Sequence, residues 1–168
     1  MQSYIRYFVV AAFVLVFDLL SKLWVLANIP VNTYYYPAPI PVIKKFFYIV
    51  HIHNEGAVWG IFSGYSFILG VFALITLILI FFFRHTIGLK APMVQYAFGL
   101  LTGGIIGNLI DRFQYGYVID FIDIHLPGYR WPAFNIADIG ITTGVTLYLL
   151  YSLYETFRSK QQTSSSKQ

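Results

Sequence analysis

The sequence contains no cysteine and few charged residues. Without cysteine it has no disulfide, no thiol nucleophile, no cysteine-based metal site and no cysteine of its own to lipidate. Charged residues make up 11% of its 168 residues, whereas 58% are hydrophobic and 20% aromatic; soluble domains carry about 25% charged residues. The net charge of +4 is small and dispersed, so nothing in it indicates a nucleic-acid partner. These absences favour one compact domain embedded in a membrane.

Four apolar stretches approach the roughly 20 residues that a helix needs to cross a hydrocarbon core of ~30 Å. Asp18 and Lys22 interrupt the first stretch, which favours a retained span over a cleaved signal peptide. The sequence therefore predicts an α-helical integral membrane protein with a single domain, residues 1–157, followed by a disordered cytoplasmic tail, residues 158–168. The four predicted transmembrane helices cover about residues 4–27, 65–83, 91–110 and 136–157.

Basic residues near the ends of these spans indicate an orientation, because cytoplasmic loops carry an excess of them. We expect both termini to be cytoplasmic and the two long loops, about residues 28–64 and 111–135, to lie outside. The six basic residues on the expected cytoplasmic side are Arg6, Arg84, Lys90, Arg158, Lys160 and Lys167.

Both outer loops contain runs of strand-forming residues. The runs are "FFYIVHI", residues 46–52, and "YGYVIDFIDI", residues 115–124, which are dense in aromatic and branched side chains. Prolines at positions 30, 37, 39 and 41 interrupt the segment before the first run. The pattern predicts a small β-sheet on the outer face of the bilayer.

Glycines at four-residue spacing mark close helix contacts in the third and fourth predicted spans. Gly99, Gly103 and Gly107 form such a seam in the third span, and Gly140 and Gly144 repeat the spacing in the fourth. We expect these two spans to pack directly together, which brings their outer ends close to one another.

Asp18 and Lys22 lie four residues apart and so share one face of the first span. One interpretation is an ion pair whose lysine extends toward the membrane surface. The other is that the pair supports an active centre.

Asn135 and Asp138 have the spacing of a capping box at a helix start. A cap alone does not explain why three more acids, Asp111, Asp120 and Asp123, gather in the same outer region. Two carboxyl groups in a half-dry cleft share one proton, because repulsion and desolvation oppose a second charge. Such a pair can activate water and polarise a peptide carbonyl without a metal or a covalent step.

The partner of Asp138 in such a pair stays open at this point. Asp120 and Asp123 are separated by an odd number of residues, so in a strand they face opposite sides and only one can enter the cleft. The spacing does not choose between them.

Five sequence blocks follow one another along the predicted spans and outer loops: "DLLSK" at 18–22, "HNEGAVWG" at 53–60, "GGIIGNLIDR" at 103–112, "VIDFID" at 118–123 and "FNIAD" at 134–138. In this order they resemble the lipoprotein signal peptidases, or signal peptidase II, of bacteria. The resemblance covers about residues 18–145. It implies that the family's two catalytic aspartates fall on Asp120 and Asp138.

The resemblance implies a four-helix aspartyl endopeptidase of the bacterial inner membrane with its active site near the outer face. Such an enzyme removes the signal peptide from diacylglyceryl-modified prolipoproteins by cleaving just before the lipidated cysteine. It implies no cofactor or metal and, as partners, the lipidated substrate and membrane lipid; we expect a monomer. Residues expected to bind substrate or support the site are Asp18, Lys22, Asn54, Gly56, Asn108, Asp111, Arg112 and Asn135.

Two details of the resemblance concern the wall of the substrate groove. His53 and Val58 differ from the arginine and alanine that are usual in the family. The segment "VWGIF", residues 58–62, is expected to contact acyl chains and the signal helix, with Trp59 as its largest side chain.

Two other classes of function compete with this prediction. The segment "HIHNE", residues 51–55, with His125 and nearby acids, suits zinc or manganese in a membrane hydrolase. Asp18, Lys22 and Asp138 could instead line the path of a small ion transporter.

Overall fold

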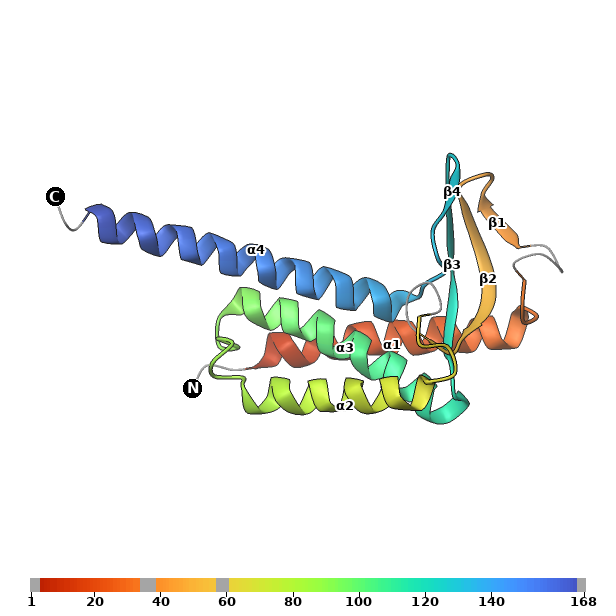
Figure 1. The fold of residues 1–168 in the computed structure, drawn as a ribbon, viewed down its shortest axis with the longest axis horizontal. Coiled ribbons are helices and arrows are strands. Elements are labelled where there is room, and N and C mark those ends of the chain that lie inside the picture. Colours follow the sequence, from red (N-terminus) through yellow and green to blue (C-terminus); the bar gives the residue numbers. More distant parts are fainter. Residues whose placement is uncertain (1–3, 34–38, 57–60, 166–168) are drawn as a thin grey trace.

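The computed structural model describes residues 4–33, 39–56 and 61–165. Figure 1 shows a bundle of helices with a small sheet at one end. Helix α3 (Pro92–Tyr115) is central and packs against α1 (Ile5–Asn28), α2 (Ser66–Phe82) and α4 (Ile136–Ser165). Consecutive helices run in opposite directions, so both long connections lie at the sheet end of the bundle.

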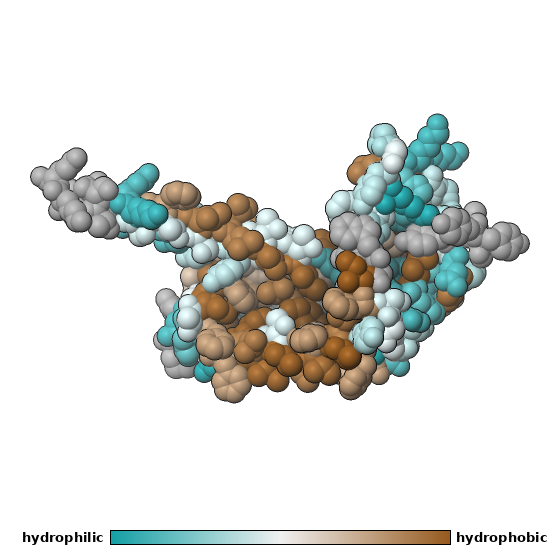
Figure 2. All heavy atoms as spheres, in the orientation of Figure 1, coloured by the Kyte–Doolittle hydropathy of each residue, from teal (hydrophilic) through white to brown (hydrophobic). Residues whose placement is uncertain are grey.

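Three helices are long and apolar enough to cross a membrane: α1, α3 and the part of α4 up to Gln162. Helix α2 is apolar over 17 residues, about 25 Å, and is thus somewhat shorter than the other candidates. Phe8, Phe67 and Phe82 are 64%, 66% and 68% exposed in the isolated chain, which a lipid environment would cover. In Figure 2 the helices are mostly hydrophobic on the visible face, whereas hydrophilic residues gather on the sheet and the far end of α4.

The four strands form an antiparallel sheet in the order β1-β2-β3-β4. Strands β2 (Phe47–Asn54) and β3 (Val118–Leu126) contain the two predicted runs and form its central pair. Strand β4 (Tyr129–Arg130) pairs with the end of β3. The predicted small sheet is therefore confirmed.

One short strand was not foreseen, because its segment is rich in proline. Strand β1 (Ile40–Ile43) contains Pro41 and pairs only with β2. It is an edge strand with a register shift after Pro41, and such positions tolerate the missing N–H of proline.

The sheet packs on the end of α1 through a small apolar cluster. Val25 of α1 and Ile29, which directly follows the helix, form a buried cluster with Ile119 and Phe121 of β3. His51 of β2 adds a polar contact, since its Nδ1 lies 2.7 Å from the carbonyl oxygen of Ile29. These contacts hold the sheet over the ends of the helices.

The glycine seam lies between different helices from those predicted. Gly99 and Gly103 face the backbone of α1, whereas Gly104 faces the backbone of α4. Gly140 and Gly144 do face α3. The predicted packing of the third and fourth spans is therefore correct. Gly99 and Gly103, however, lie in the contact between α1 and α3, because residues four apart share one helix face and this face points to α1.

The prediction of a disordered tail from residue 158 was wrong as far as Ser165, because α4 continues to that residue. Arginine, lysine and glutamine favour helix. Arg158 also lies 3.8 Å from the carboxylate of Glu155, and Ser159 donates to the Thr156 carbonyl oxygen.

Gly104→Ala should destabilise the protein, because a Cβ there would overlap the carbonyl oxygen of Ala137 in α4. We expect a loss of about 1–3 kcal/mol, as for other overpacked sites. The measurement is the unfolding temperature in detergent.

Gly70→Ala is the matched control. Its added Cβ would meet Phe113 at an ordinary 3.5 Å, and alanine favours helix more than glycine does. Equal unfolding temperatures for the two variants would contradict the predicted close contact.

Candidate active site

Asp138 lies in the first turn of α4 and forms the predicted capping box with Asn135. The backbone N–H of Asn135 donates to Oδ2 of Asp138 over 3.1 Å, and the backbone N–H of Asp138 donates to Oδ1 of Asn135 over 3.0 Å. The box fixes the carboxylate at the helix start, where the free amides favour negative charge.

Two asparagines connect Asp138 to Asp120 of β3. Asn108 donates from Nδ2 to Oδ1 of Asp138 over 2.8 Å, and Asn135 donates from Nδ2 to Oδ1 of Asp120, also over 2.8 Å. The Asn135 amide donates as well to Oδ1 of Asn108, 3.1 Å away. Asp120 and Asp138, called the aspartate pair below, thus belong to one hydrogen-bonded group.

Asn54, at the end of β2, supplies the remaining donor. Its Nδ2 lies 2.9 Å from Oδ2 of Asp120, while its Oδ1 accepts the backbone N–H of Gly56. Each of the four oxygens of the aspartate pair therefore accepts one N–H. This pattern offsets part of the desolvation cost of two carboxyl groups in one site.

Burial and, to a smaller extent, the nearby charge of Asp138 together raise the pKa of Asp120 to about 8. The side chain is only 2% exposed, whereas Asp138 is half-buried. Asp120 therefore carries a proton at neutral pH and can act as an acid.

The aspartate pair lines a cavity of about 910 Å³. Its walls come from the β2–β3 face of the sheet and from α2, α3 and α4, including Ala73 of α2 and Thr142 and Thr143 of α4. Asp120 and Asp138 are thus the two aspartates that the fold brings together in the predicted cleft, whose wall also includes Glu55.

Arg112 reaches the same cavity from α3. It makes two long hydrogen bonds of 3.3 Å, to the carbonyl oxygens of Asn108 and Gly56. Its Nε is buried and has no hydrogen-bond partner among the described residues. The Arg112 guanidinium therefore has N–H groups beside the aspartate pair that can donate to the backbone of a bound substrate.

The predicted ion pair of Lys22 with Asp18 is present, but the lysine does not extend to the membrane surface, so that part of the interpretation was wrong. The side chain is 2% exposed, and its Nζ lies 2.7 Å from Asp18, 2.8 Å from Asp111 and 3.0 Å from Oδ1 of Asn108. The two carboxylates of Asp18 and Asp111 stabilise the buried ammonium group more than contact with water at the membrane surface would. Asp18 also accepts the backbone N–H of Ala137, so the group supports the start of α4.

Asp123 lies away from the aspartate pair, as strand alternation predicts for one of the two β3 aspartates. It is fully buried and pairs with Nη2 of Arg130, while its Oδ1 accepts from Nε of Arg130 over 2.9 Å. Nε2 of His125 lies 2.9 Å from Oδ2. Asp123 thus holds β3 against β4.

The histidines of "HIHNE" do not gather with acids into a metal site. His53 stacks on Tyr117 with ring centroids 3.6 Å apart, and His51 contacts the carbonyl oxygen of Ile29. In the described part of the chain, no three histidine or acidic residues lie close enough to hold a metal ion.

Sequence reasoning missed part of the cavity wall, namely Thr142, Phe134 and Trp131. Thr142 could have been found, because it lies four residues after Asp138 and so on the same helix face. Val58 and Trp59, expected to line the groove, fall outside the described residues, whereas Ile61 and Phe62 are exposed.

The family described as "Signal peptidase (SPase) II" matches residues 10–154 of the sequence. The chain belongs to the signal peptidase II family. As a member of this family it is an aspartic peptidase with lipoprotein signal peptidase activity, and the family implies a prolipoprotein substrate.

Relatives in the family and solved structures agree with this assignment. The lipoprotein signal peptidase of Oleidesulfovibrio alaskensis is 40% identical over 83% of this chain and 90% of its own. The lipoprotein signal peptidase of Halothermothrix orenii is 36% identical over 86% of this chain and 92% of its own. A bacterial membrane enzyme solved by the in meso method is 35% identical with a TM-score of 0.80, covering 89% of this chain and 88% of its own. The chain is thus a multi-pass bacterial membrane protein.

Relative to the wild type, Asp120→Asn should gain stability as pH rises, because it lacks the buried carboxyl group. Because the pKa of Asp120 is raised to about 8 in the folded protein, wild-type stability falls as pH rises from about 4, the ordinary carboxyl value, toward that value. Asparagine has no proton to lose. The gain in unfolding temperature should therefore be larger at pH ~9 than at pH ~5. The corresponding change in the free energy of unfolding is at most ~1.4 kcal/mol per pH unit.

Asp123→Asn is the control in the same strand and should lower the unfolding temperature, because it weakens the pair with Arg130. A gain for Asp120→Asn that is independent of pH would contradict the raised pKa.

Proposed function

We propose that this enzyme cleaves diacylglyceryl-modified prolipoproteins just before the lipidated cysteine, with Asp120 and Asp138 as its catalytic residues. The observation that carries the proposal is the aspartate pair itself, two carboxyl groups held by four N–H donors at the wall of one large cavity. Beyond the pair, the reaction uses water and the substrate alone.

The two carboxyl groups take different roles because their surroundings differ. Asp138 is half-buried at a helix start near Arg112, which favours the ionised form. Asp120 is almost fully buried, and its pKa is raised to about 8, so it holds the proton. Asp138 is therefore the base and Asp120 the acid.

The reaction begins when Asp138 takes a proton from water and the resulting hydroxyl attacks the scissile carbonyl carbon. Asp120 gives its proton to the carbonyl oxygen, which yields a neutral tetrahedral diol. In the collapse, the diol returns a proton to Asp120, and Asp138 gives its proton to the leaving amine nitrogen. Both aspartates then regain their starting states.

Most of the polar residues around the pair support it rather than bind substrate. The amides of Asn54, Asn108 and Asn135 are oriented by their bonds to the carboxyl oxygens. Arg112 has the unused donor and is our candidate for binding the substrate backbone. Gly56 orients Asn54 and accepts from Arg112, so it connects the two groups.

Lipid fixes the height at which the scissile bond enters. The cavity has walls from α2 and α4, two apolar helices with exposed outer faces, so a substrate can enter from the bilayer between them. Two acyl chains next to the scissile bond set its depth and add ~0.8 kcal/mol of binding free energy per buried methylene. Part of that energy should serve positioning.

The same arrangement suggests an orientation in the membrane. We propose that the sheet end faces outward in the inner membrane and that both termini are cytoplasmic, in line with the basic residues at the opposite end. One chain supplies every described contact to the aspartate pair, so a monomer suffices.

Asp120→Asn and Asp138→Asn should each reduce cleavage of a diacylglyceryl prolipoprotein by at least about 10³-fold, since neither amide can exchange the proton. Asp123→Asn should keep substantial activity. The assay uses purified protein in detergent with EDTA present, and reads the released signal peptide.

The unlipidated form of the same substrate should be cleaved more slowly even at saturation, because the acyl chains position the scissile bond. Full activity of either pair variant, loss only at Asp123→Asn, or equal turnover of both substrates would contradict the mechanism. Loss of wild-type activity in EDTA and its return with zinc would favour a metal site instead.

A further inference from the structure

The ammonium group of Lys22 lies directly behind the aspartate pair and has three polar partners. It donates a hydrogen bond to Oδ1 of Asn108 over 3.0 Å and forms ion pairs with Asp18 at 2.7 Å and Asp111 at 2.8 Å. The side chain is 98% buried, so water does not compete for these contacts. The geometry around Nζ is therefore fixed from three directions.

Lys22 determines which way the Asn108 amide points. An ammonium group only donates, so the amide atom that faces it must be the oxygen. Asn135 donates to that oxygen as well. The Nδ2 group of Asn108 must then face Asp138, where it donates over 2.8 Å. Turning the amide round would place its NH₂ against both an ammonium and another amide NH₂.

We propose that Lys22 is a positioning residue for the peptidase reaction. Through Asn108 it keeps an N–H donor on Oδ1 of Asp138, so that this carboxylate holds one orientation toward water and the scissile bond. The inference rests on the proposed role of the aspartate pair. It gives Lys22 no contact with substrate.

The charges around Lys22 fit such an indirect role. Asp18 on its own helix and Asp111 on α3 offset its charge at close range. Burial raises the pKa of Asp120 by more than the remaining charge of Lys22 lowers it, and Asn108 is the hydrogen-bonded link from Lys22 to the pair. Asp18 and Asp111 in turn accept the backbone N–H groups of Ala137 in α4 and Ile119 in β3. The other charged groups of this region are Asp120 in β3, Asp138 in α4 and Arg112 in α3.

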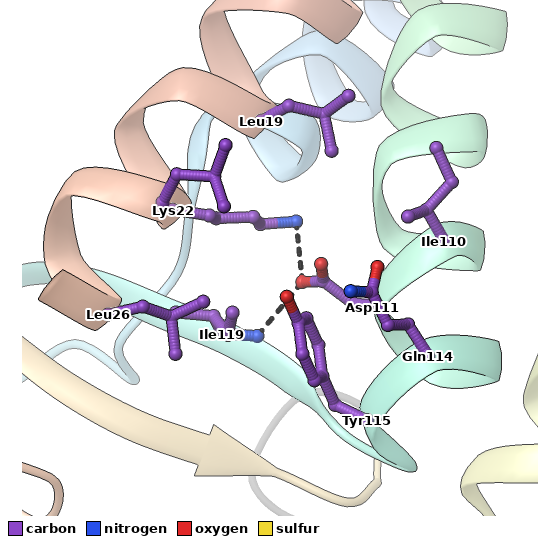
Figure 3. Close-up of a pocket in the computed structure, with 9 residues that line it drawn as sticks. Leu19, Lys22, Leu26, Ile110, Asp111, Gln114, Tyr115 and Ile119 are labelled. Carbon is purple, nitrogen blue, oxygen red and sulfur yellow. Dashed lines mark hydrogen bonds and ion pairs between the residues drawn. The ribbon is translucent and has the colours of Figure 1, made fainter.

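A second cavity offers a way to test the role chemically. It has about 230 Å³, lies between α1, α3 and β3, and shares no lining residue with the large cavity. Figure 3 shows the Lys22 side chain extending across it to Asp111, with Leu19, Leu26 and Ile110 around them. Removing the lysine side chain would extend this cavity toward Asn108, so a small amine could replace the missing ammonium.

Lys22→Ala should lower kcat for the lipidated substrate by about 10²-fold, as for other misplaced catalytic groups, and should leave KM within about threefold. Ethylammonium in the assay should raise kcat of Lys22→Ala at least about tenfold, because it brings back an N–H donor for Asn108. Tetramethylammonium has the same charge but no N–H and should not.

Thr102→Val is the matched control, because it removes another α1–α3 hydrogen bond, the 3.1 Å bond from Tyr7, far from the aspartate pair. It should keep wild-type kcat and show no response to amines. A folded Lys22→Ala with normal kcat, with a change in KM alone, or with lost activity that ethylammonium does not restore would overturn the proposal.

If Lys22→Ala does not fold, Asn108→Asp tests whether Asp138 needs the N–H donor that Lys22 keeps in place. The new carboxylate can still pair with Lys22, but it can donate to Asp138 only when protonated. The pH optimum should therefore fall by about one unit, with lower kcat at neutral pH. Normal activity, or a loss at an unchanged optimum, would refute the role. Full activity of Asp120→Asn or Asp138→Asn would instead refute the proposed function.

Discussion

The structure depends on the cost of placing two carboxyl groups at the edge of an apolar helix bundle. Such groups are stable there only if each oxygen has a donor. Here three of the four donors are asparagine side chains from three different parts of the chain: Asn54 in β2, Asn108 in α3 and Asn135 before α4. The sheet and the helix ends must therefore stay together for the site to exist.

Close packing of the helices makes this assembly possible. Glycines let α3 approach the backbones of α1 and α4, and at Gly107 a Cβ would collide with the carboxylate of Asp18. That carboxylate accepts from the first turn of α4 and pairs with Lys22, which in turn orients Asn108. Close packing of the helices thus acts, through the three polar groups of Asp18, Lys22 and Asn108, on the orientation of Asp138.

Local patterns allowed much of this arrangement to be predicted. The capping box of Asn135 and Asp138, the two central strands and the opposite faces of Asp120 and Asp123 all follow from spacings of a few residues. The burial of Lys22 did not, because it depends on Asp111, which is 89 positions away in the sequence and reaches Lys22 only through the α1–α3 contact. The same limit applies to the glycines, since spacing shows a close contact but not its partner.

The proposed mechanism requires that the aspartate pair holds one proton at neutral pH and that Asp120 carries it. Infrared spectroscopy of the carboxyl C=O stretch, titrated in detergent from pH ~5 to pH ~10, tests this most directly. We expect one protonated carboxyl that is lost near pH 8, as the raised pKa of Asp120 requires, absent in Asp120→Asn and retained in Asp123→Asn. A wild-type protein with no protonated carboxyl at neutral pH, or one that persists in Asp120→Asn, would contradict the account.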